Sequence, residues 1–124
     1  FPNISIAKTT EIVHWSWLGA SDAAVWKTCI DDFNAAHDGK GVQIKMETIA
    51  SDQYDTKLLA SAATGKAPDF GWQWTGSKAN WANDGVIVPM DKLISDAGLD
   101  LSDFSKNSID KCRYPQVDNQ ICSI

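Results

Sequence analysis

Nothing in this chain favours nucleic acid or a membrane as a partner. Its 11 lysines and arginines are outnumbered by 16 aspartates and glutamates, so the formal net charge is -5, and the two signs are interspersed along the chain. Such a chain does not attract phosphate backbones, and we expect no nucleic-acid partner. No apolar run approaches the roughly 18 residues of a membrane-spanning helix. No charged-then-apolar signal segment opens the sequence, and we expect any signal peptide to have been removed.

The usual catalytic motifs are also absent. The sequence contains no glycine-rich phosphate loop, no G-x-S-x-G turn and no H-E-x-x-H pair. Its two histidines, His14 and His37, have no cysteine or carboxylate at metal-ligand spacing, which favours a structural role for both. We therefore expect no enzymatic activity, no cofactor and no metal site.

Cysteine is scarce, with three residues in the chain. Cys29 falls on the apolar face of an expected helix, where a thiol acts as a small buried hydrophobic group. Cys112 and Cys122 stand on the two arms of an expected hairpin around a turn at 115–119. Opposed residues of a non-hydrogen-bonded pair come within the range of a disulfide. We therefore expect a disulfide between Cys112 and Cys122, which would contribute about 2 to 3 kcal/mol and would fit a compartment outside the cytosol.

The residues that are present are typical of one α/β domain or part of one. Of the 124 residues, 44% are hydrophobic, which is enough for a core. Residues 1–10 are polar and irregular and are expected to form a flexible lead. Residues 11–17 are rich in β-branched and aromatic side chains, which indicates a strand covered on both faces. A helix capped by Ser21 or Asp22 follows. Its apolar face consists of Trp26, Cys29, Ile30 and Phe33.

The next two strands determine the expected order of the sheet. Residues 42–49 alternate between apolar and polar side chains, as in an edge strand with one wet face. A second helix opens at Ser51 or Asp52, and Pro68 then forces the chain into an extended segment over 69–74. Two successive strand-helix-strand units give a parallel sheet with right-handed crossovers. Since the second strand is an edge and the other two are central, we predict the order 2-1-3, flanked by helices.

Shorter elements are expected in the second half of the chain. A helix surrounds Trp81, and a capped helix covers 91–97. Asp100 or Ser102 opens a further short helix. The chain is also rich in tryptophan, with six residues. Because Trp26 and Trp81 lie inside helical patterns, we expect both in the core.

Five segments together resemble a known family. They are EIVHWSW (11–17), DDFN (31–34), GKAPD (65–69), WANDGVIVPMD (81–91) and QICSI (120–124). In order and spacing they resemble the extracellular solute-binding proteins of ABC importers, and most closely the carbohydrate-binding group that includes maltose-binding protein. The resemblance implies a periplasmic-binding-protein-like lobe that is incomplete in this chain. Residues 11–124 would form the first part of the N-terminal lobe of a two-lobed protein several times this length.

The resemblance also implies a function without catalysis. Proteins of this family bind sugar reversibly between lobes that close around it, and they deliver it to the membrane permease subunits of an ABC importer. The implied location is extracellular or periplasmic, a lipid anchor to the cell surface is left open, and we expect a monomer. The residues alone leave a rival interpretation, a small flavodoxin-like α/β enzyme or redox domain acting at the same edge of the sheet.

The expected ligand site lies outside the carboxyl ends of the strands, as in other open α/β sheets. The resemblance places first-lobe contacts in the loops at 17–20 and 73–76. A sugar needs an aromatic platform for its C–H faces, and side chains that both donate and accept hydrogen bonds. The expected ligand-binding residues are Trp17, Gly19, Gln73, Trp74, Thr75 and Gly76.

Trp17 and Trp74 are the expected platforms because each comes last in its strand. The sequence departs from maltose-binding protein in the same loops. Trp17 and Gly19 stand where that protein has polar contacts, and Gln73 stands where it has an aromatic one. The resemblance therefore predicts the class of ligand and does not identify the sugar.

Overall fold

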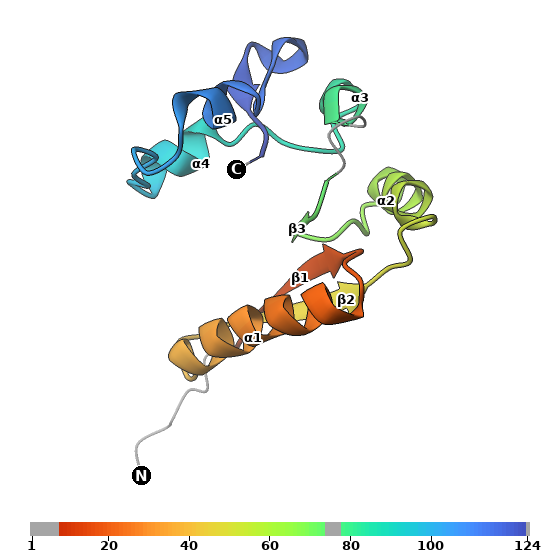
Figure 1. Ribbon diagram of the computed structural model, residues 1–124, viewed down its shortest axis with the longest axis vertical. Coiled ribbons are helices and arrows are strands. Elements are labelled where there is room, and N and C mark those ends of the chain that lie inside the picture. The colour runs from red at the N-terminus through yellow and green to blue at the C-terminus, as the bar shows by residue number, and fades with distance from the viewer. Residues whose placement is uncertain (1–7, 74–77, 124) are drawn as a thin grey trace. The chain divides into compact units, whose positions relative to one another are not determined.

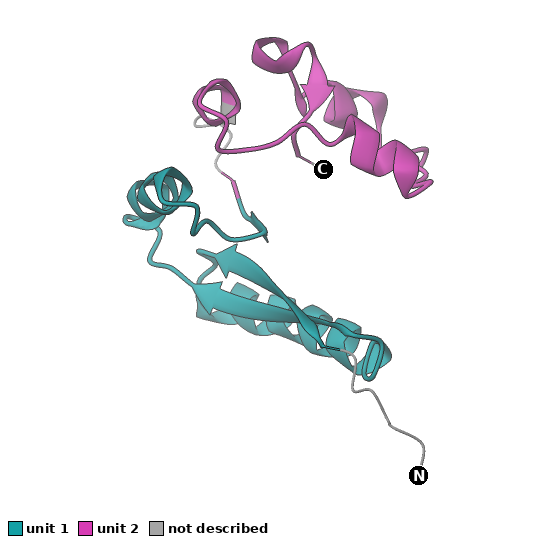
Figure 2. Ribbon diagram, turned by 180° about the vertical axis from the view of Figure 1, so that it is seen from behind, with its two compact units in different colours: residues 1–72 teal, residues 73–124 magenta. Residues whose placement is uncertain are grey.

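The computed structural model describes residues 8–73 and 78–123, and it divides the chain into two compact units, residues 1–72 and 73–124 (Figure 2). Of the expected flexible lead, residues 1–7 lie outside the described part, and Thr10 already belongs to the first strand. The first unit holds a parallel sheet with two helices, and the second holds short helices and a hairpin (Figure 1). No helix in the described part is long and apolar enough to cross a membrane.

Two strand-helix-strand steps build the first unit. Its elements are β1 (Thr10–Ser16), α1 (Ala20–Ala36), β2 (Val42–Thr48), α2 (Tyr54–Ala63) and β3 (Phe70–Gly71). The strands pair in parallel in the order β2-β1-β3, which confirms the predicted α/β class and sheet order. β2 pairs with β1 along its whole length. β3 pairs with β1 only opposite His14 and Trp15, so the strand expected over 69–74 is shorter than predicted.

The side chains of Asp69 and Asn34 accept or donate hydrogen bonds at strand residues that have no strand partner on that side. Asp69 donates its backbone N–H to the Val13 carbonyl (2.9 Å), and its Oδ2 accepts the Val13 N–H (2.8 Å). Asn34 of α1 does the same for β2: its Nδ2 donates to the Ile44 carbonyl (2.9 Å), and its Oδ1 accepts the Ile44 N–H (2.8 Å). Unpaired backbone groups are costly when they leave water, so both side chains stabilise the sheet.

The two faces of the sheet are covered by different helices. Near its end β1 is buried on both faces, as predicted: His14 contacts Trp26 of α1, and Trp15 contacts Tyr54 of α2. The first four residues of β2 alternate between half-buried and exposed, which confirms the predicted edge strand with one wet face.

Both helices of the first unit begin without the predicted side-chain caps. The N-cap residues are Gly19 for α1 and Gln53 for α2. At neither helix does a side chain of the N-cap residue accept a backbone N–H of the first turn. The expected burial of Cys29 is also wrong, because its side chain is exposed while its neighbour Ile30 is the buried residue of α1. Successive residues of a helix point about 100° apart, so Cys29 falls off the narrow stripe that faces the sheet.

The second unit is built from short elements. They are α3 (Lys78–Asn83), α4 (Asp91–Asp96), α5 (Lys106–Asp110), β4 (Arg113–Tyr114), the 3-10 turn η1 (Pro115–Val117) and β5 (Gln120–Ile121). β4 and β5 are antiparallel, and Ala82, Tyr114 and Cys122 pack together as the core. The burial of Trp81 confirms its predicted core position.

Asp91 ties α4 to this hairpin. Its Oδ2 accepts the N–H of Ile121 (2.5 Å), and its Oδ1 accepts from the guanidinium of Arg113 (3.0 Å). The hydrogen bond from Ile121 holds the pKa of Asp91 below its usual value, and Arg113 acts in the same direction. The ionised carboxylate is therefore the form that joins the two elements.

The short helix expected from Asp100 or Ser102 is wrong. The carboxylate of Asp100 instead accepts the N–H of Ser102 (2.8 Å) and its hydroxyl (2.9 Å), which closes a turn. The next helix, α5, begins only after Ser105, whose hydroxyl accepts the N–H of Ser108 (3.2 Å). Both aspartate and serine can cap a helix or close a local turn, and here Asp100 does the latter.

The predicted disulfide between Cys112 and Cys122 is also wrong, since both are free cysteines in the structure. The two residues do lie opposite each other, because the Cys122 N–H donates to the Cys112 carbonyl (3.0 Å). This contact makes them a hydrogen-bonded pair, in which the side chains stand farther apart than in the non-hydrogen-bonded pair we expected. Burial raises the pKa of the Cys122 thiol, with the Asp91 charge adding to the effect.

Candidate functional site

The carboxyl ends of β1 and β3 meet at one edge of the sheet. Trp15 of β1 is paired in parallel with Gly71 of β3, so the residues that follow these strands leave the sheet at the same edge. This is the edge at which open α/β sheets bind ligands. Of the six expected ligand-binding residues, Trp17 and Gly19 are described there, Gln73 is described as the first residue of the second unit, and 74–76 lie outside the described residues.

The loop after β1 leads directly into α1. Trp17 is half-buried, and the Ser16 hydroxyl accepts the N–H of Leu18 (3.2 Å). Gly19 is exposed, and its carbonyl accepts the first helical hydrogen bond, from Ala23 (2.8 Å). Because the helix has no side-chain cap, its first backbone N–H groups are available as hydrogen-bond donors.

The residues at the end of β3 expose apolar area at the same edge. Phe70 is 40% exposed and Trp72 is 37% exposed. They lie two positions apart, on the same face of the chain. Gln73 follows and is half-buried, and its Oε1 is buried with no hydrogen-bond partner among the described residues.

Four aromatic rings on the α1 side of the sheet form one cluster, which we call the four-ring cluster: His14, Trp26, Phe70 and Trp72. The His14 ring stacks on Phe70 with centroids 4.3 Å apart and meets Trp26 edge-on at 5.6 Å. Trp26 in turn meets Trp72 edge-on at 5.4 Å. The cluster therefore runs from the buried centre of the sheet to the exposed indole of Trp72.

His14 is the polar member of the four-ring cluster and is only 1% exposed. The indole Nε1–H of Trp26 donates to its Nε2 at 2.7 Å. Its Nδ1 is buried and makes no hydrogen bond of ordinary geometry. Burial lowers the pKa of His14, and the backbone of Phe70 acts in the opposite direction. The ring is therefore held in its neutral form.

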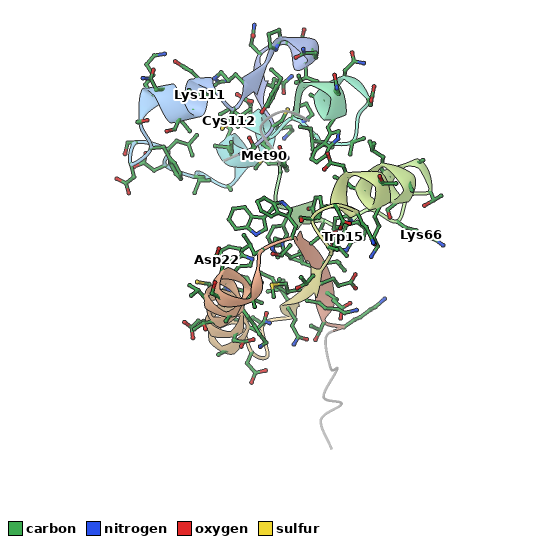
Figure 3. The ribbon with its side chains drawn as sticks, turned by 45° about the vertical axis from the view of Figure 1, so that its right-hand side comes forward. Trp15, Asp22, Lys66, Met90, Lys111 and Cys112 are labelled. Carbon is green, nitrogen blue, oxygen red and sulfur yellow. The ribbon has the colours of Figure 1, made fainter. Side chains whose placement is uncertain are left out.

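The opposite face of the sheet is closed by a different set of contacts. Trp15 meets the ring of Tyr54 edge-on at 6.3 Å, its Nε1–H donates to Glu47 (3.1 Å), and the Lys57 ammonium lies 4.6 Å from its ring centre. In Figure 3, Trp15 lies beside α2 and Asp22 marks the start of α1. None of these groups lies at the exposed end of the four-ring cluster, so this face supports the site and does not line it.

Gly71 leaves the space that Tyr54 fills. The Tyr54 hydroxyl is within 3.3 Å of the Trp15 carbonyl, and a Cβ at residue 71 would lie 2.4 Å from that hydroxyl. Burial, together with the nearby Asp55 charge, raises the pKa of Tyr54 to about 12. The hydroxyl is thus a neutral donor that fixes α2 to the end of β1, in the space beside Gly71 of β3.

Sequence patterns missed part of this arrangement. Trp26 was expected in the core, but it is half-buried and links His14 to Trp72. Trp72 was not among the expected ligand residues. The alternation of residues 70 and 72 against 71 and 73 is the signal that could have identified it. In the described residues no three His, Cys, Asp or Glu side chains gather into a group that could hold a metal ion.

One comparison with known proteins identifies a family. A protein-family model described as bacterial extracellular solute-binding protein matches residues 28–122. No curated protein matches the chain.

Solved structures similar to this chain show the same fold. They include extracellular solute-binding protein family 1 from Alicyclobacillus acidocaldarius (TM-score 0.78, 21% identity, 92% of this chain). Two others were solved with a carbohydrate: CpMnBP1 with mannotriose bound (0.77, 22%, 91%), and the ABC substrate-binding protein Lmo0181 from Listeria monocytogenes in complex with cycloalternan (0.73, 24%, 88%). This chain spans 27% of the length of each of these three structures.

Proposed function

The chain belongs to the bacterial extracellular solute-binding protein family, and we propose that it is part of a protein that binds an oligosaccharide for uptake by an ABC importer. The protein acts outside the cytoplasmic membrane, as an extracellular or periplasmic monomer. It binds its ligand reversibly, closes a second lobe over it, and hands it to the permease subunits without catalysis. The carbohydrates bound in two proteins of similar fold support this ligand class.

The observation that carries this proposal is the exposed indole of Trp72 at the ligand edge of the sheet. Sugars present apolar C–H faces, which stack on flat aromatic rings. Trp72 offers such a face, and its contact with Trp26 holds the ring in place. Phe70 extends the same apolar surface.

Hydrogen-bonding groups stand on both sides of this aromatic surface in the sequence. We propose that the amide of Gln73, which can both donate and accept, bonds a sugar hydroxyl, and the uncapped start of α1 at Gly19 supplies backbone donors. Trp17 supplies a second ring, and we propose Trp74, Thr75 and Gly76 as further contacts. Hydroxyl groups both donate and accept, so such a mixed set suits a sugar better than an anion.

Calorimetry on the full-length protein with a panel of oligosaccharides tests the proposal. We expect at least one oligosaccharide to bind, and Trp72→Ala to weaken that binding by about tenfold, as for the loss of one stacking ring. Lys92→Ala, at an exposed ion pair of α4, is the control and should bind as wild type. Lack of binding to any sugar, or turnover of one, would reject the proposal in favour of another ligand or of an enzyme.

A further inference from the structure

His14 is a buried polar side chain that the proposed ligand contacts do not use. It lies inside the sheet at 1% exposure, on a strand where an aliphatic residue would pack without burying a ring nitrogen. Burying a polar group costs free energy unless it gains a hydrogen bond. Within the described part of the chain, the side-chain hydrogen bond of ordinary geometry that His14 makes is the one from Trp26, at 2.7 Å. We therefore attribute the presence of a histidine at residue 14 to its hydrogen bond with Trp26.

The chemistry of this bond fixes its direction. An indole nitrogen can only donate, so the Nε2 atom of His14 must be the unprotonated nitrogen of the ring. The ring proton then sits on Nδ1. A leucine or phenylalanine at residue 14 could fill the space, but it could not hold the indole of Trp26 in one orientation.

The orientation of Trp26 in turn affects Trp72. The two indoles meet at 62° with centroids 5.4 Å apart, so the edge of one ring supports the other. Trp26 comes from α1 and Trp72 from the segment after β3, and this contact joins the two elements at the ligand edge. A rotation of Trp26 would remove the support from Trp72.

We propose that His14 is a positioning residue for the ligand-binding surface of Trp72, and that it acts through its hydrogen bond to Trp26. The inference rests on the proposed function, because it gives the four-ring cluster the task of holding a carbohydrate-stacking indole. His14 itself does not touch the ligand. Its effect on affinity is the effect of pre-organising a ring before the ligand arrives.

The test uses the full-length protein and measures affinity for the oligosaccharide that it binds best, together with melting temperature. His14→Leu removes the acceptor, and Trp26→Phe removes the donor while keeping a ring. We expect each to weaken binding by about two- to tenfold, the range of one hydrogen bond. The double variant should be no weaker than either single variant, because both break the same interaction. His14→Leu and Trp26→Phe should each also change the near-ultraviolet circular dichroism that arises from Trp26 and Trp72.

A conservative variant and a matched control separate positioning from general stability. His14→Gln restores an acceptor and should recover most of the affinity that His14→Leu loses. Trp15→Phe also deletes one indole N–H hydrogen bond, the one to Glu47 on the opposite face. It should lower the melting temperature, because a hydrogen bond is lost. It should leave the affinity within about twofold of wild type, because that bond does not hold Trp26 or Trp72.

Failure of this inference can be told apart from failure of the proposed function. If Trp72→Ala loses affinity while His14→Leu and Trp26→Phe bind as wild type, the ligand surface stands and the positioning role is rejected. If wild type and Trp72→Ala bind alike, or neither binds a sugar, the proposed ligand surface itself is rejected and the positioning role with it. Should His14→Leu fail to fold, Trp26→Phe alone decides the matter.

Discussion

The two faces of the first unit's sheet are stabilised in different ways at the same edge. On the α2 face, Tyr54 fits into the space above Gly71, and Trp15 is enclosed by a ring, a carboxylate and an ammonium group. On the α1 face, the four-ring cluster is joined by edge and stacking contacts and ends in an indole that water reaches. The comparison indicates that one face fixes the strands by close packing, while the other leaves an aromatic surface available for a ligand.

The largest expected difference is between the tryptophans of the two faces. Trp15→Ala should lower the free energy of unfolding by about 3 to 5 kcal/mol, because it empties a buried aromatic position. Trp72→Ala should cost about 1 kcal/mol, since over a third of that side chain is already exposed. Urea unfolding followed by far-ultraviolet circular dichroism measures both. Equal losses would show that the two faces do not differ in the way described.

A smaller effect is expected at Gly71. Gly71→Ala places a methyl group 2.4 Å from the Tyr54 hydroxyl and 3.0 Å from the Trp15 carbonyl. Such overpacking costs about 1 to 3 kcal/mol of unfolding free energy. Tyr54→Phe removes the hydroxyl, so the double variant should be more stable than the sum of the two single losses predicts. Additive losses in the same urea experiment would mean that the hydroxyl does not determine the need for glycine.

The smallest expected effect is on the α1 face and depends on pH. The pKa of His14 is lowered by burial from an ordinary value of 6.5. Above that pH both the folded and unfolded chains carry a neutral ring, and stability does not change through this group. As pH falls below 6.5 the unfolded chain takes up the proton first, so the free energy of unfolding falls until the folded pKa is passed.

Urea unfolding between about pH 5 and pH 8 isolates this loss, because carboxylates titrate mainly below that range. His14→Gln should flatten the profile, since it removes the titrating group. A wild-type profile that is level across the range, or one that the substitution leaves unchanged, would show that His14 is not held neutral by the fold.

Much of the fold could be predicted from the sequence because its patterns are local. The alternation in β2 and the β-branched and aromatic content of β1 identify an edge and a centre, and the order β2-β1-β3 follows from them. The start of β3 does not follow, because at residue 69 the Asp69 carboxylate accepts the N–H of Val13 in place of a strand partner. Helical spacing placed Trp26 on the apolar side of α1, but it contains no information on its bond with His14.

The errors in the second unit have a similar cause. Cys112 and Cys122 were correctly placed opposite each other, but the sequence does not say which kind of antiparallel pair they form. Aspartate is a residue type that often caps a helix, and only the contacts of Asp100 with Ser102 show that it closes a turn here. The candidate site could be placed at the carboxyl edge from strand order alone. The exposed ring of Trp72 required the structure, because burial is decided by contacts between distant residues.

Asn34 has a consequence for the association of one molecule with another. β2 is one of the two edge strands of the described sheet, and an open edge is a template on which a second chain can add a strand. The carboxamide of Asn34 carries the same donor and acceptor as a peptide group, and it already occupies both groups of Ile44 in the middle of β2. An incoming strand would have to displace it or leave a gap in its ladder. A single side chain thus opposes strand addition at the middle of this edge.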